Sequence, residues 1–514
     1  MFQVRIKFRR LQRQVIPMMP HSFLFGHLRI LAKLTSHLPK NCHHNCLSQA
    51  ISENWQTLFP GRTSCPPVFY IDMWPMSPPI IFVTDPETAG QFVSDSSIPR
   101  SHLIRSTIAP LTDNLDFVSL EGEEWKTWRA RFNPSFSTKN VLTLVHGMTK
   151  DVQVFTDIIR KRAGVNGGWG SVFPLEDLTT NLTIDVIGRT VLDIELNEQT
   201  AGPSKFKSHF RDQISRFIFV LNIVTVWKWC SPWRLSAIAR NRHVMHSELL
   251  PSIERCLSET RTQKDSRKTI IDLALKPVTS TVDEEKVPPM DQLFIDTVVS
   301  QLELFMFAGH DTTATVLFWV LHCIAKNPEV GRKLRAEHDE ILGEDPSKAS
   351  ATLRLSPHLL NSLLYTGGII KEALRLYPGP MSLRDVDRDT GVRCPTDGFI
   401  LWDGIRSRSR SEELWPRAKD VVPERWLTTN DNDPLRPKKH SWRMFGSGNR
   451  NCIGQELAVT EMKIVLVFMA REIDVDCAWD EWDAKKVFVE GDRCYQVDKG
   501  TPHINDGMPV HVRL

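Results

Sequence analysis

The longest apolar pattern in the chain predicts one helix over residues 291–327. The segment is apolar at both ends, and Pro328 would stop the helix. Its middle, FAGHDTT at 307–313, is polar. A glycine within a helix costs about 1 kcal/mol relative to alanine, so its presence needs a local reason. We therefore expect a functional site around Asp311 and Thr312; the alternative is a polar patch that packs on another helix.

Two shorter helical patterns place pairs of polar residues on one face. Residues 121–140 begin with acidic residues, which suit the first turn of a helix, and Pro134 limits the helix at its far end. Trp125 and Arg129 are four residues apart and share a face there. In 369–376, IIKEALRL, Glu372 and Arg375 are three residues apart on one face.

Two further segments have no polar pair but a clear pattern. The apolar, β-branched run 214–229 is too short to span a membrane, and the plain interpretation is that it belongs to the core. The last 35 residues or so alternate as strands do, with turn signals at Asn505, Gly507 and Pro509.

Composition and charge narrow the class of protein. A length of 514 residues would suggest two or three domains, but no Pro/Gly/Ser-rich linker divides the chain. We therefore predict a single, mainly helical domain over 21–514. The net charge of +3 is too small for a nucleic-acid-binding protein. None of the 10 cysteines forms a CxxC pair, which predicts free thiols in a reducing compartment.

Residues 1–20 form a basic lead. RIKFRRLQRQ contains five basic residues and no acid, and Pro17 and Pro20 follow it as a hinge. No stretch near the N-terminus is long and apolar enough to cross a bilayer. A basic lead can bind anionic lipid, which predicts peripheral membrane contact, although a frayed, solvated end fits the residues equally well.

The most informative string is FGSGNRNCIG at 445–454. It surrounds Cys452 with three glycines, and it adds Phe445 and Arg450. Glycines let the backbone approach a flat ligand closely, the aromatic ring covers the sulfur, and the arginine adds a fixed charge. This combination indicates a pocket that holds a thiolate against a large anionic cofactor. A dinucleotide fingerprint is excluded, because Asn451 stands where a third glycine is needed and no strand-like run precedes it.

This string resembles, position by position, the haem-binding signature F-x-x-G-x-R-x-C-x-G of the cytochrome P-450 family. Other motifs of that family follow the same order along the chain: W-x-x-x-R at 125–129, A-G-x-D-T at 308–312, E-x-x-R at 372–375 and P-E-R at 423–425. The resemblance implies the cytochrome P-450 fold, mainly α with a smaller β-rich region. It also implies a haem-dependent monooxygenase that inserts one oxygen atom from O2 into an apolar small molecule.

The resemblance also implies a role for each matched residue. Cys452 would be the axial ligand of the haem iron, and Asp311 and Thr312 would deliver protons, with Ala308 and Gly309 leaving room for dioxygen. The residues expected to bind the haem beside Cys452 are Trp125, Arg129, Arg384, Phe445 and Arg450. A buried structural cluster would consist of Glu372, Arg375 and Arg425.

Partners and location are implied in the same way. The chain has no nucleotide-binding motif, so the electrons would come from an NADPH-dependent flavoprotein reductase that docks on the Cys452 side. The hinge and the GHDTTA string are similar to those of fungal and other eukaryotic microsomal members. That similarity implies the cytoplasmic face of the endoplasmic reticulum and a role in secondary-metabolite biosynthesis. The run 214–229 lies where the family has a lid that admits apolar substrate.

One segment departs from the family. Residues 405–413, IRSRSRSEE, replace a longer stretch that includes a strand of the substrate cavity. Polar residues cannot replace an apolar strand without leaving charges unpaired or moving them to solvent, so we expect this segment to bulge outward. Two alternatives to a working monooxygenase follow: a catalytically impaired haem protein, and a haem-thiolate isomerase or dehydratase that needs no reductase.

Overall fold

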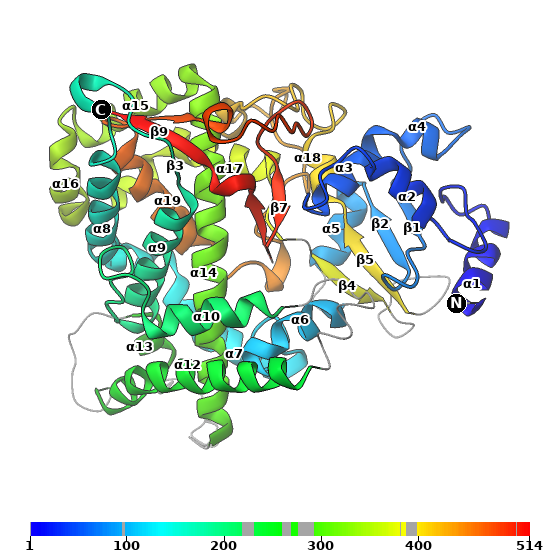
Figure 1. Ribbon diagram of the computed structural model, residues 1–514, viewed down its shortest axis with the longest axis horizontal. Coiled ribbons are helices and arrows are strands. Elements are labelled where there is room, and N and C mark those ends of the chain that lie inside the picture. Colours follow the sequence, from blue (N-terminus) through cyan, green and yellow to red (C-terminus); the bar gives the residue numbers. More distant parts are fainter. Residues whose placement is uncertain are drawn as a thin grey trace.

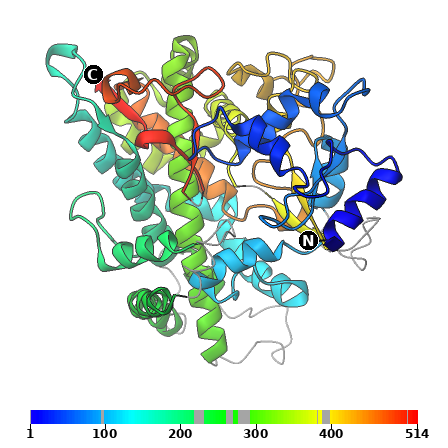
Figure 2. The ribbon, with the colours of Figure 1, turned by 45° about the vertical axis from the view of Figure 1, so that its right-hand side comes forward.

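The computed structural model describes residues 2–94, 98–217, 231–259, 269–275, 292–380, 382–386, 398–499 and 501–514. Helix α14 (Gln292–Lys326) runs through the molecule, with a helix-rich part on one side and a sheet with the N-terminal helices on the other (Figures 1 and 2). The other helices are α1 Phe2–Arg13, α2 Leu28–Thr35, α3 Asn45–Glu53, α4 Trp55–Leu58, α5 Pro86–Ser94, α6 His102–Thr112, α7 Gly122–Phe132, α8 Thr138–Arg160, α9 Glu176–Ile187, α10 Lys205–Ser215, α12 Pro232–Glu259, α13 Ile270–Ala274, α15 Pro328–Leu342, α16 Ala349–Leu355, α17 Leu364–Leu376, α18 Ile405–Ser409, α19 Gln455–Met469 and α20 Trp479–Trp482.

The strands form small sheets. The largest has four strands in the order β1 (Val68–Ile71), β2 (Ile80–Val83), β5 (Phe399–Asp403) and β4 (Leu383–Val386). A second sheet has three strands in the order β3 (Phe173–Pro174), β9 (Pro509–Arg513) and β6 (Asp474–Cys477). The antiparallel pair β7 (Gln496–Asp498) and β8 (Pro502–Ile504) forms the third sheet of the described residues. The strand-like alternation at the C-terminus is thus confirmed in β7, β8 and β9.

Helix α14 confirms the longest predicted helix. It is buried over most of its length, and its apolar flanks pack in the main hydrophobic core. Among the described residues it is the one helix that is long and apolar enough to cross a membrane. However, 72% of its most apolar window is buried inside the protein, as expected of a core helix.

The other helical patterns also form helices. Helix α7 ends at Phe132, and Pro134 stands in the short 3-10 turn Asn133–Phe136 that separates α7 from α8. Ser137 then caps α8, because its hydroxyl accepts a hydrogen bond from the Asn140 N–H. Helix α17 ends at Leu376, before Pro378. Most of the run 214–229 lies outside the described residues.

The N-terminal lead is folded rather than frayed. Helix α1 buries Phe8 and Leu11 against the large sheet, and the guanidinium of Arg5 forms a buried ion pair with Asp72. The opposite face of α1 keeps exposed arginines at 9, 10 and 13. The basic charge of the lead is therefore divided between a structural contact and a solvent-facing surface.

The structure contradicts the outward bulge expected of 405–413. Residues 406–409 are buried, and 405–409 form the short helix α18. The expectation was wrong because each arginine of the segment forms an ion pair with an acidic residue. One of these acids lies shortly before the segment, and the other lies far along the chain. Arg408 pairs with Asp403 at the end of β5, while Arg406 and Arg410 both pair with Glu490.

We therefore expect slow amide hydrogen exchange in this segment. The N–H of Arg408 donates to the Gly404 carbonyl at 3.3 Å, and the N–H of Ser411 donates to the Arg408 carbonyl at 3.1 Å. Hydrogen-bonded amides in a buried turn exchange only when the turn opens. Exchange measured by mass spectrometry should be much slower for the amides of 408–411 than for those of the exposed turn at 429–433. Equal, fast exchange of the two segments would contradict the buried placement.

Candidate active site

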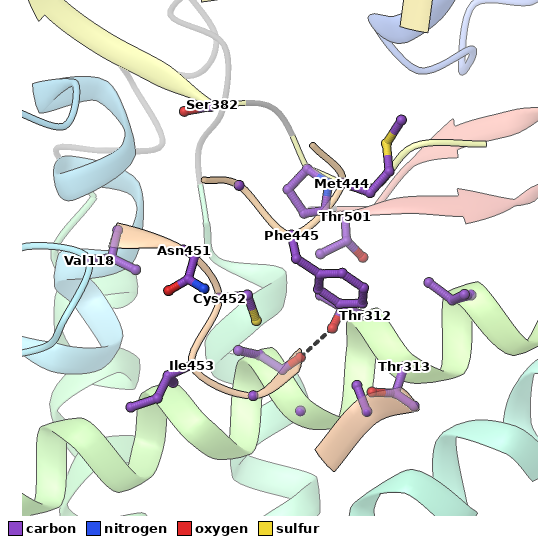
Figure 3. Close-up of a pocket in the computed structure, with 18 of the residues that line it drawn as sticks. Val118, Thr312, Thr313, Ser382, Met444, Phe445, Asn451, Cys452, Ile453 and Thr501 are labelled. Atoms are coloured by element: carbon purple, nitrogen blue, oxygen red, sulfur yellow. Dashed lines mark hydrogen bonds between the residues drawn. The ribbon is translucent and has the colours of Figure 1, made fainter. Parts of the chain in front are cut away.

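A cavity of about 380 Å³ lies between the middle of α14, the loop that carries Cys452 and the turn between β7 and β8. Most of its lining is apolar, and it includes Phe117, Leu304, Val316 and Leu374. Figure 3 shows the Cys452 sulfur pointing into this space, with Thr312 and Thr501 also on its lining. Of the eight cysteines in the described parts of the chain, all of them free thiols, Cys452 is the one that lines the cavity.

The loop around Cys452 is fixed by its own backbone. The N–H of Cys452 donates to the Phe445 carbonyl at 2.7 Å and closes the turn. Gly446 and Gly448 adopt φ values of 75° and 71°, which side-chain-bearing residues rarely do. Helix α19 begins three residues after the cysteine, so its N-terminal dipole lies close to the sulfur.

The electrostatics of Cys452 combine opposing influences. Burial raises the pKa of the thiol, while the Gly454 N–H and the charges of Arg129 and Arg100 act to lower it. Cys452 is not covered completely by the protein, and its sulfur points into the cavity (Figure 3). The sulfur is thus presented to whatever fills the cavity.

Four of the residues expected to bind the cofactor carry N–H donors, and all four line the cavity: Trp125, Arg129, Arg384 and Arg450. Arg129 donates to the Asn451 carbonyl at 3.0 Å and to its side-chain oxygen at 2.8 Å, and so fastens the cysteine loop to α7. The guanidinium of Arg450 lies over the Trp125 indole at 4.2 Å and pairs with Glu121. Arg384, in β4, donates to the Ile98 carbonyl at 3.1 Å.

Two further arginines of the lining have no motif in the sequence. Arg100, between α5 and α6, donates to the Arg450 carbonyl at 3.3 Å and forms a backbone bridge with Arg384. Arg443 precedes the cysteine loop and donates to Asp403 at 2.7 Å. Both were missed because they stand in irregular segments, where no helical or strand spacing relates them to another polar residue.

The lining fits a large anionic group that accepts a thiolate. Burial lowers the pKa of Arg100, Arg129 and Arg450, so these cations lack enough negative charge around them. The Nε atoms of Arg100 and Arg450 are buried and have no hydrogen-bond partner among the described residues. Buried donors without partners are costly, and carboxylates of a bound group would satisfy them.

The polar turn of α14 meets the cavity through Ala308, Gly309 and Thr312. The Thr312 hydroxyl donates to the Ala308 carbonyl at 2.6 Å (Figure 3). A Cβ on Gly309 would lie 2.5 Å from Ile187 of α9. Gly309 is therefore required for the close approach of α9 to α14, in addition to the open space expected beside it.

Asp311 does not point to Thr312. Its carboxylate accepts a hydrogen bond from the Thr501 hydroxyl and pairs with His503 Nε2 at 3.0 Å. His503 Nδ1 lies 2.6 Å from Glu176. Sequence reasoning missed Thr501 and His503, because the C-terminal hairpin reaches α14 across 190 residues of sequence.

This contact makes Asp311 an ion at neutral pH. Burial acts to raise the pKa of Asp311, but the hydrogen bond and the charge of His503 outweigh it and bring the pKa down to about 2. Burial likewise acts to lower the pKa of His503, but Asp311 and Glu176 raise it to about 9. The pair therefore rests as carboxylate and imidazolium.

A pH dependence of stability follows from these shifts. The pKa of His503 is higher in the folded than in the unfolded chain, so its contribution to stability is complete below about pH 6.5 and is lost as the pH rises through 9. The contribution of Asp311 to stability is present above the pKa that its carboxyl has in the unfolded chain, and it is lost only in strong acid, as the pH falls to about 2. We expect the free energy of unfolding of the wild type to approach that of His503→Gln between pH 6.5 and 9, as measured in urea. A constant difference between the two proteins over this range would contradict the shift.

The structure also brings together the three charged residues at 372, 375 and 425. Glu372 pairs with Arg375 at 2.8 Å and with Arg425 at 3.1 Å, and all three side chains are fully buried. Glu372 also accepts the Val422 N–H at 2.9 Å and the Trp426 indole N–H at 3.0 Å.

A row of aromatic rings connects this cluster with the cysteine loop. The ring of Trp426 lies 5.6 Å from that of Trp442, which lies 6.1 Å from Phe445. Such separations are typical of packed aromatic pairs. A displacement of the cluster would therefore shift these rings and disturb the turn that Phe445 closes with Cys452.

Comparisons with known proteins agree with this geometry. The family model described as Cytochrome P450 matches residues 62–485. The chain is 35% identical to the cytochrome P450 monooxygenase polC of Polytolypa hystricis, over 100% of this chain and 92% of that protein. It is 28% identical to the cytochrome P450 monooxygenase acrF of Aspergillus aculeatus, over 87% of this chain and 94% of that protein.

A solved structure shows the same fold. The crystal structure of the cytochrome P450DA heme domain superimposes with a TM-score of 0.70 at 19% identity, and the match covers 97% of each chain. From the sequence relationship and the fold together, the chain belongs to the cytochrome P450 family: it is a haem-binding monooxygenase.

Proposed function

We propose that this enzyme holds haem through Cys452 and inserts one oxygen atom of O2 into an apolar small molecule. The observation that carries the proposal is one free thiol, Cys452, that lines the same apolar cavity as several buried or half-buried arginines. When bound, haem with a thiolate ligand supplies the activation of dioxygen, because the thiolate donates electron density that favours O–O cleavage.

The residues that line the cavity would then have three roles: binding the propionates, supplying protons and excluding water. Trp125, Arg129, Arg384 and Arg450, with Arg100, would neutralise the propionates, and Phe445 would cover the sulfur on its loop. Thr312 and Asp311 would supply protons from the α14 side of the cavity. The apolar lining would exclude water and favour substrates with few polar groups.

The substrate class and the pathway are proposed on two grounds. The cavity walls are mainly aliphatic and aromatic. The similar proteins polC and acrF are monooxygenases of fungi, and so is the cytochrome P450 monooxygenase ptmG of Penicillium ochrochloron, which is 22% identical to this chain. We propose a fungal enzyme that modifies an apolar precursor in secondary-metabolite biosynthesis.

The electron source and the location are part of the same proposal. Monooxygenases of this family take electrons from a redox partner, and we propose an NADPH-dependent flavoprotein reductase. We propose the cytoplasmic face of the endoplasmic reticulum as its location. There the exposed arginines at 9, 10 and 13 of α1 would contact anionic lipid, and 21–514 would form the catalytic domain.

The test uses the purified holoprotein with a fungal reductase. A panel of apolar compounds is screened for shifts of the haem spectrum, and those that bind are incubated with NADPH under ¹⁸O2. Product that contains one ¹⁸O atom is the expected result. Turnover without NADPH would instead identify an isomerase or dehydratase, and haem binding without any NADPH-dependent O2 consumption would identify an impaired protein.

Thr312→Ala is expected to uncouple turnover without affecting haem binding. The Thr312 hydroxyl lines the cavity, and its hydrogen bond to Ala308 leaves its oxygen able to accept another hydrogen bond. Without it, NADPH consumption should yield several-fold more hydrogen peroxide and less product. Haem content per protein should stay at the wild-type value, and Thr312→Ser should restore coupling. Equal coupling in Thr312→Ala and the wild type would remove Thr312 from the proton path.

A further inference from the structure

We propose that the C-terminal hairpin β7–β8 completes the proton path of this enzyme, with Thr501 between Asp311 and the cavity, and with His503 and Glu176 between Asp311 and solvent. This inference rests on the proposed function, because it assigns new residues to the supply of protons for that reaction. None of the three residues belongs to a motif of the sequence.

The first step of the path is the contact between Asp311 and Thr501. The Thr501 hydroxyl donates to Asp311 Oδ2, and Thr501 itself lines the cavity (Figure 3). Thr312 lines the same cavity but bonds back to the Ala308 carbonyl. Thr501 is therefore the hydroxyl that joins the buried carboxylate to the reaction space.

The second step leads away from the cavity. His503 Nε2 lies 3.0 Å from Asp311 Oδ1, and His503 Nδ1 lies 2.6 Å from Glu176 Oε1. Glu176 accepts from Lys499 Nζ at 2.7 Å, and the side chain of Lys499 is 48% exposed. An unbroken row of hydrogen bonds thus runs from the cavity wall to the surface.

The hairpin geometry explains why these residues face α14 together. Thr501 directly precedes β8 and His503 is its middle residue, and the His503 N–H donates to the Thr501 carbonyl at 2.9 Å in a tight turn that brings both side chains to Asp311. The register pairs His503 with Val497 and Pro502 with Asp498, which holds β8 against β7. Asn505 extends the ladder, because its N–H donates to the Tyr495 carbonyl at 3.1 Å.

The charges around His503 favour an imidazolium that stores one proton. Carboxylates face it from two helices, Asp311 on α14 and Glu176 on α9, and Lys499 stands beyond Glu176. The other titratable neighbours are His310 and His43, and burial lowers the pKa of both, so they are neutral. The row therefore holds a proton next to Asp311 throughout the neutral pH range.

The transfer is balanced and involves no electrons. His503 Nε2 gives its proton to the Asp311 carboxylate. Asp311 then passes a proton to the Thr501 oxygen while the Thr501 hydroxyl releases its own proton into the cavity, and Asp311 is a carboxylate again. His503 is left neutral with its other proton on Nδ1, toward Glu176, and becomes the imidazolium again by taking up one proton from solvent at Nε2, so that one proton moves from solvent to the cavity in each passage.

The first experiment is done without added substrate and measures what fraction of the consumed O2 is reduced to hydrogen peroxide and what fraction to water. Reduction of O2 to peroxide uses one NADPH, whereas reduction to water uses two NADPH and two more protons. In Thr501→Val we expect a several-fold larger fraction of O2 recovered as hydrogen peroxide, with unchanged haem content. Thr501→Ser keeps the hydroxyl and should behave as the wild type. An equal peroxide fraction in the wild type and in Thr501→Val would overturn the role of Thr501.

The second experiment tests His503 without turnover. Histidine-labelled holoprotein is titrated by NMR in its diamagnetic ferrous carbon monoxide form. His503, assigned by its loss in His503→Gln, should remain an imidazolium to about pH 9, and Asp311→Asn should move its titration to lower pH. A His503 that titrates normally in the wild type would overturn the second step.

Turnover of His503→Gln completes this test. We expect a lower rate of water formation and a larger solvent isotope effect, because refilling of Asp311 then becomes slow. The matched control is His511→Gln, a histidine of β9 that contacts Asp476 and Glu481 outside the row, and it should leave both quantities unchanged. Equal solvent isotope effects in His503→Gln and the wild type would contradict the path.

The outcomes separate this inference from the proposed function. If the wild type consumes no O2 with NADPH and reductase, the proposed function fails, while the NMR titration still reports on the row. If the wild type is active and the Thr501 and His503 variants match it, the proposed function stands and the hairpin path is wrong.

Discussion

Cys452→Ala is expected to abolish the red-shifted Soret band that the reduced protein with carbon monoxide shows when a thiolate binds the haem iron. The reason is geometric: Cys452 is the one cysteine of the described chain whose sulfur reaches the cavity, so none of the other described thiols is placed to replace it. NADPH-dependent oxygenation should fall to the background of the assay, because the thiolate supplies the electron density for O–O cleavage.

The control for this variant is another partly exposed thiol. Cys65→Ala changes a cysteine that lies beside Pro66 and Thr84, away from the cavity, and should leave the band in place. Haem content by the pyridine haemochrome assay separates loss of the ligand from loss of the cofactor. A persisting thiolate band in Cys452→Ala would show that another residue binds the iron.

The parts of the site that the sequence predicts are those with local spacing. Trp125 and Arg129 share a face of α7 because they are four residues apart, and the Cys452 loop carries its glycines within ten residues. Helix α14 was predictable because its apolar pattern extends over 35 residues. In each case the constraint acts within one element, where periodicity can report it.

The parts that the sequence did not predict depend on partners far along the chain. Arg100 donates a hydrogen bond to the Arg450 carbonyl, and His503 forms an ion pair with Asp311. The partners in each pair are far apart in the sequence, and no periodic pattern relates them. The segment 405–413 was expected outside the core because its arginines looked unpaired. Asp403 and Glu490 neutralise them, and only the fold brings Glu490 to that place.

Glu372→Ala is expected to prevent the accumulation of stable holoprotein. Arg375 and Arg425 would face each other in the interior without a carboxylate, and the Val422 and Trp426 N–H groups would lose their acceptor. Breaking a buried ion pair costs about 3–5 kcal/mol. Since domains are stable by about 5–15 kcal/mol, this is a large share of the total.

Glu329→Ala is the matched control, because Glu329 and Arg332 form the same Glu–Arg pair three residues apart on a solvent-exposed helix face. Exposed pairs contribute little, so its melting temperature should equal that of the wild type. The cluster also holds the end of α18 and the chain that follows it, since Arg375 donates to the carbonyls of Ser409 and Ala418 at 2.6 Å. Loss of Glu372 should therefore loosen the aromatic row that reaches Phe445, and haem should dissociate before the helices melt.

Glu372→Gln keeps the shape and one acceptor oxygen, and we expect intermediate stability from it. A Glu372→Ala protein with wild-type haem content and melting temperature would show that the cluster does not support the cysteine loop.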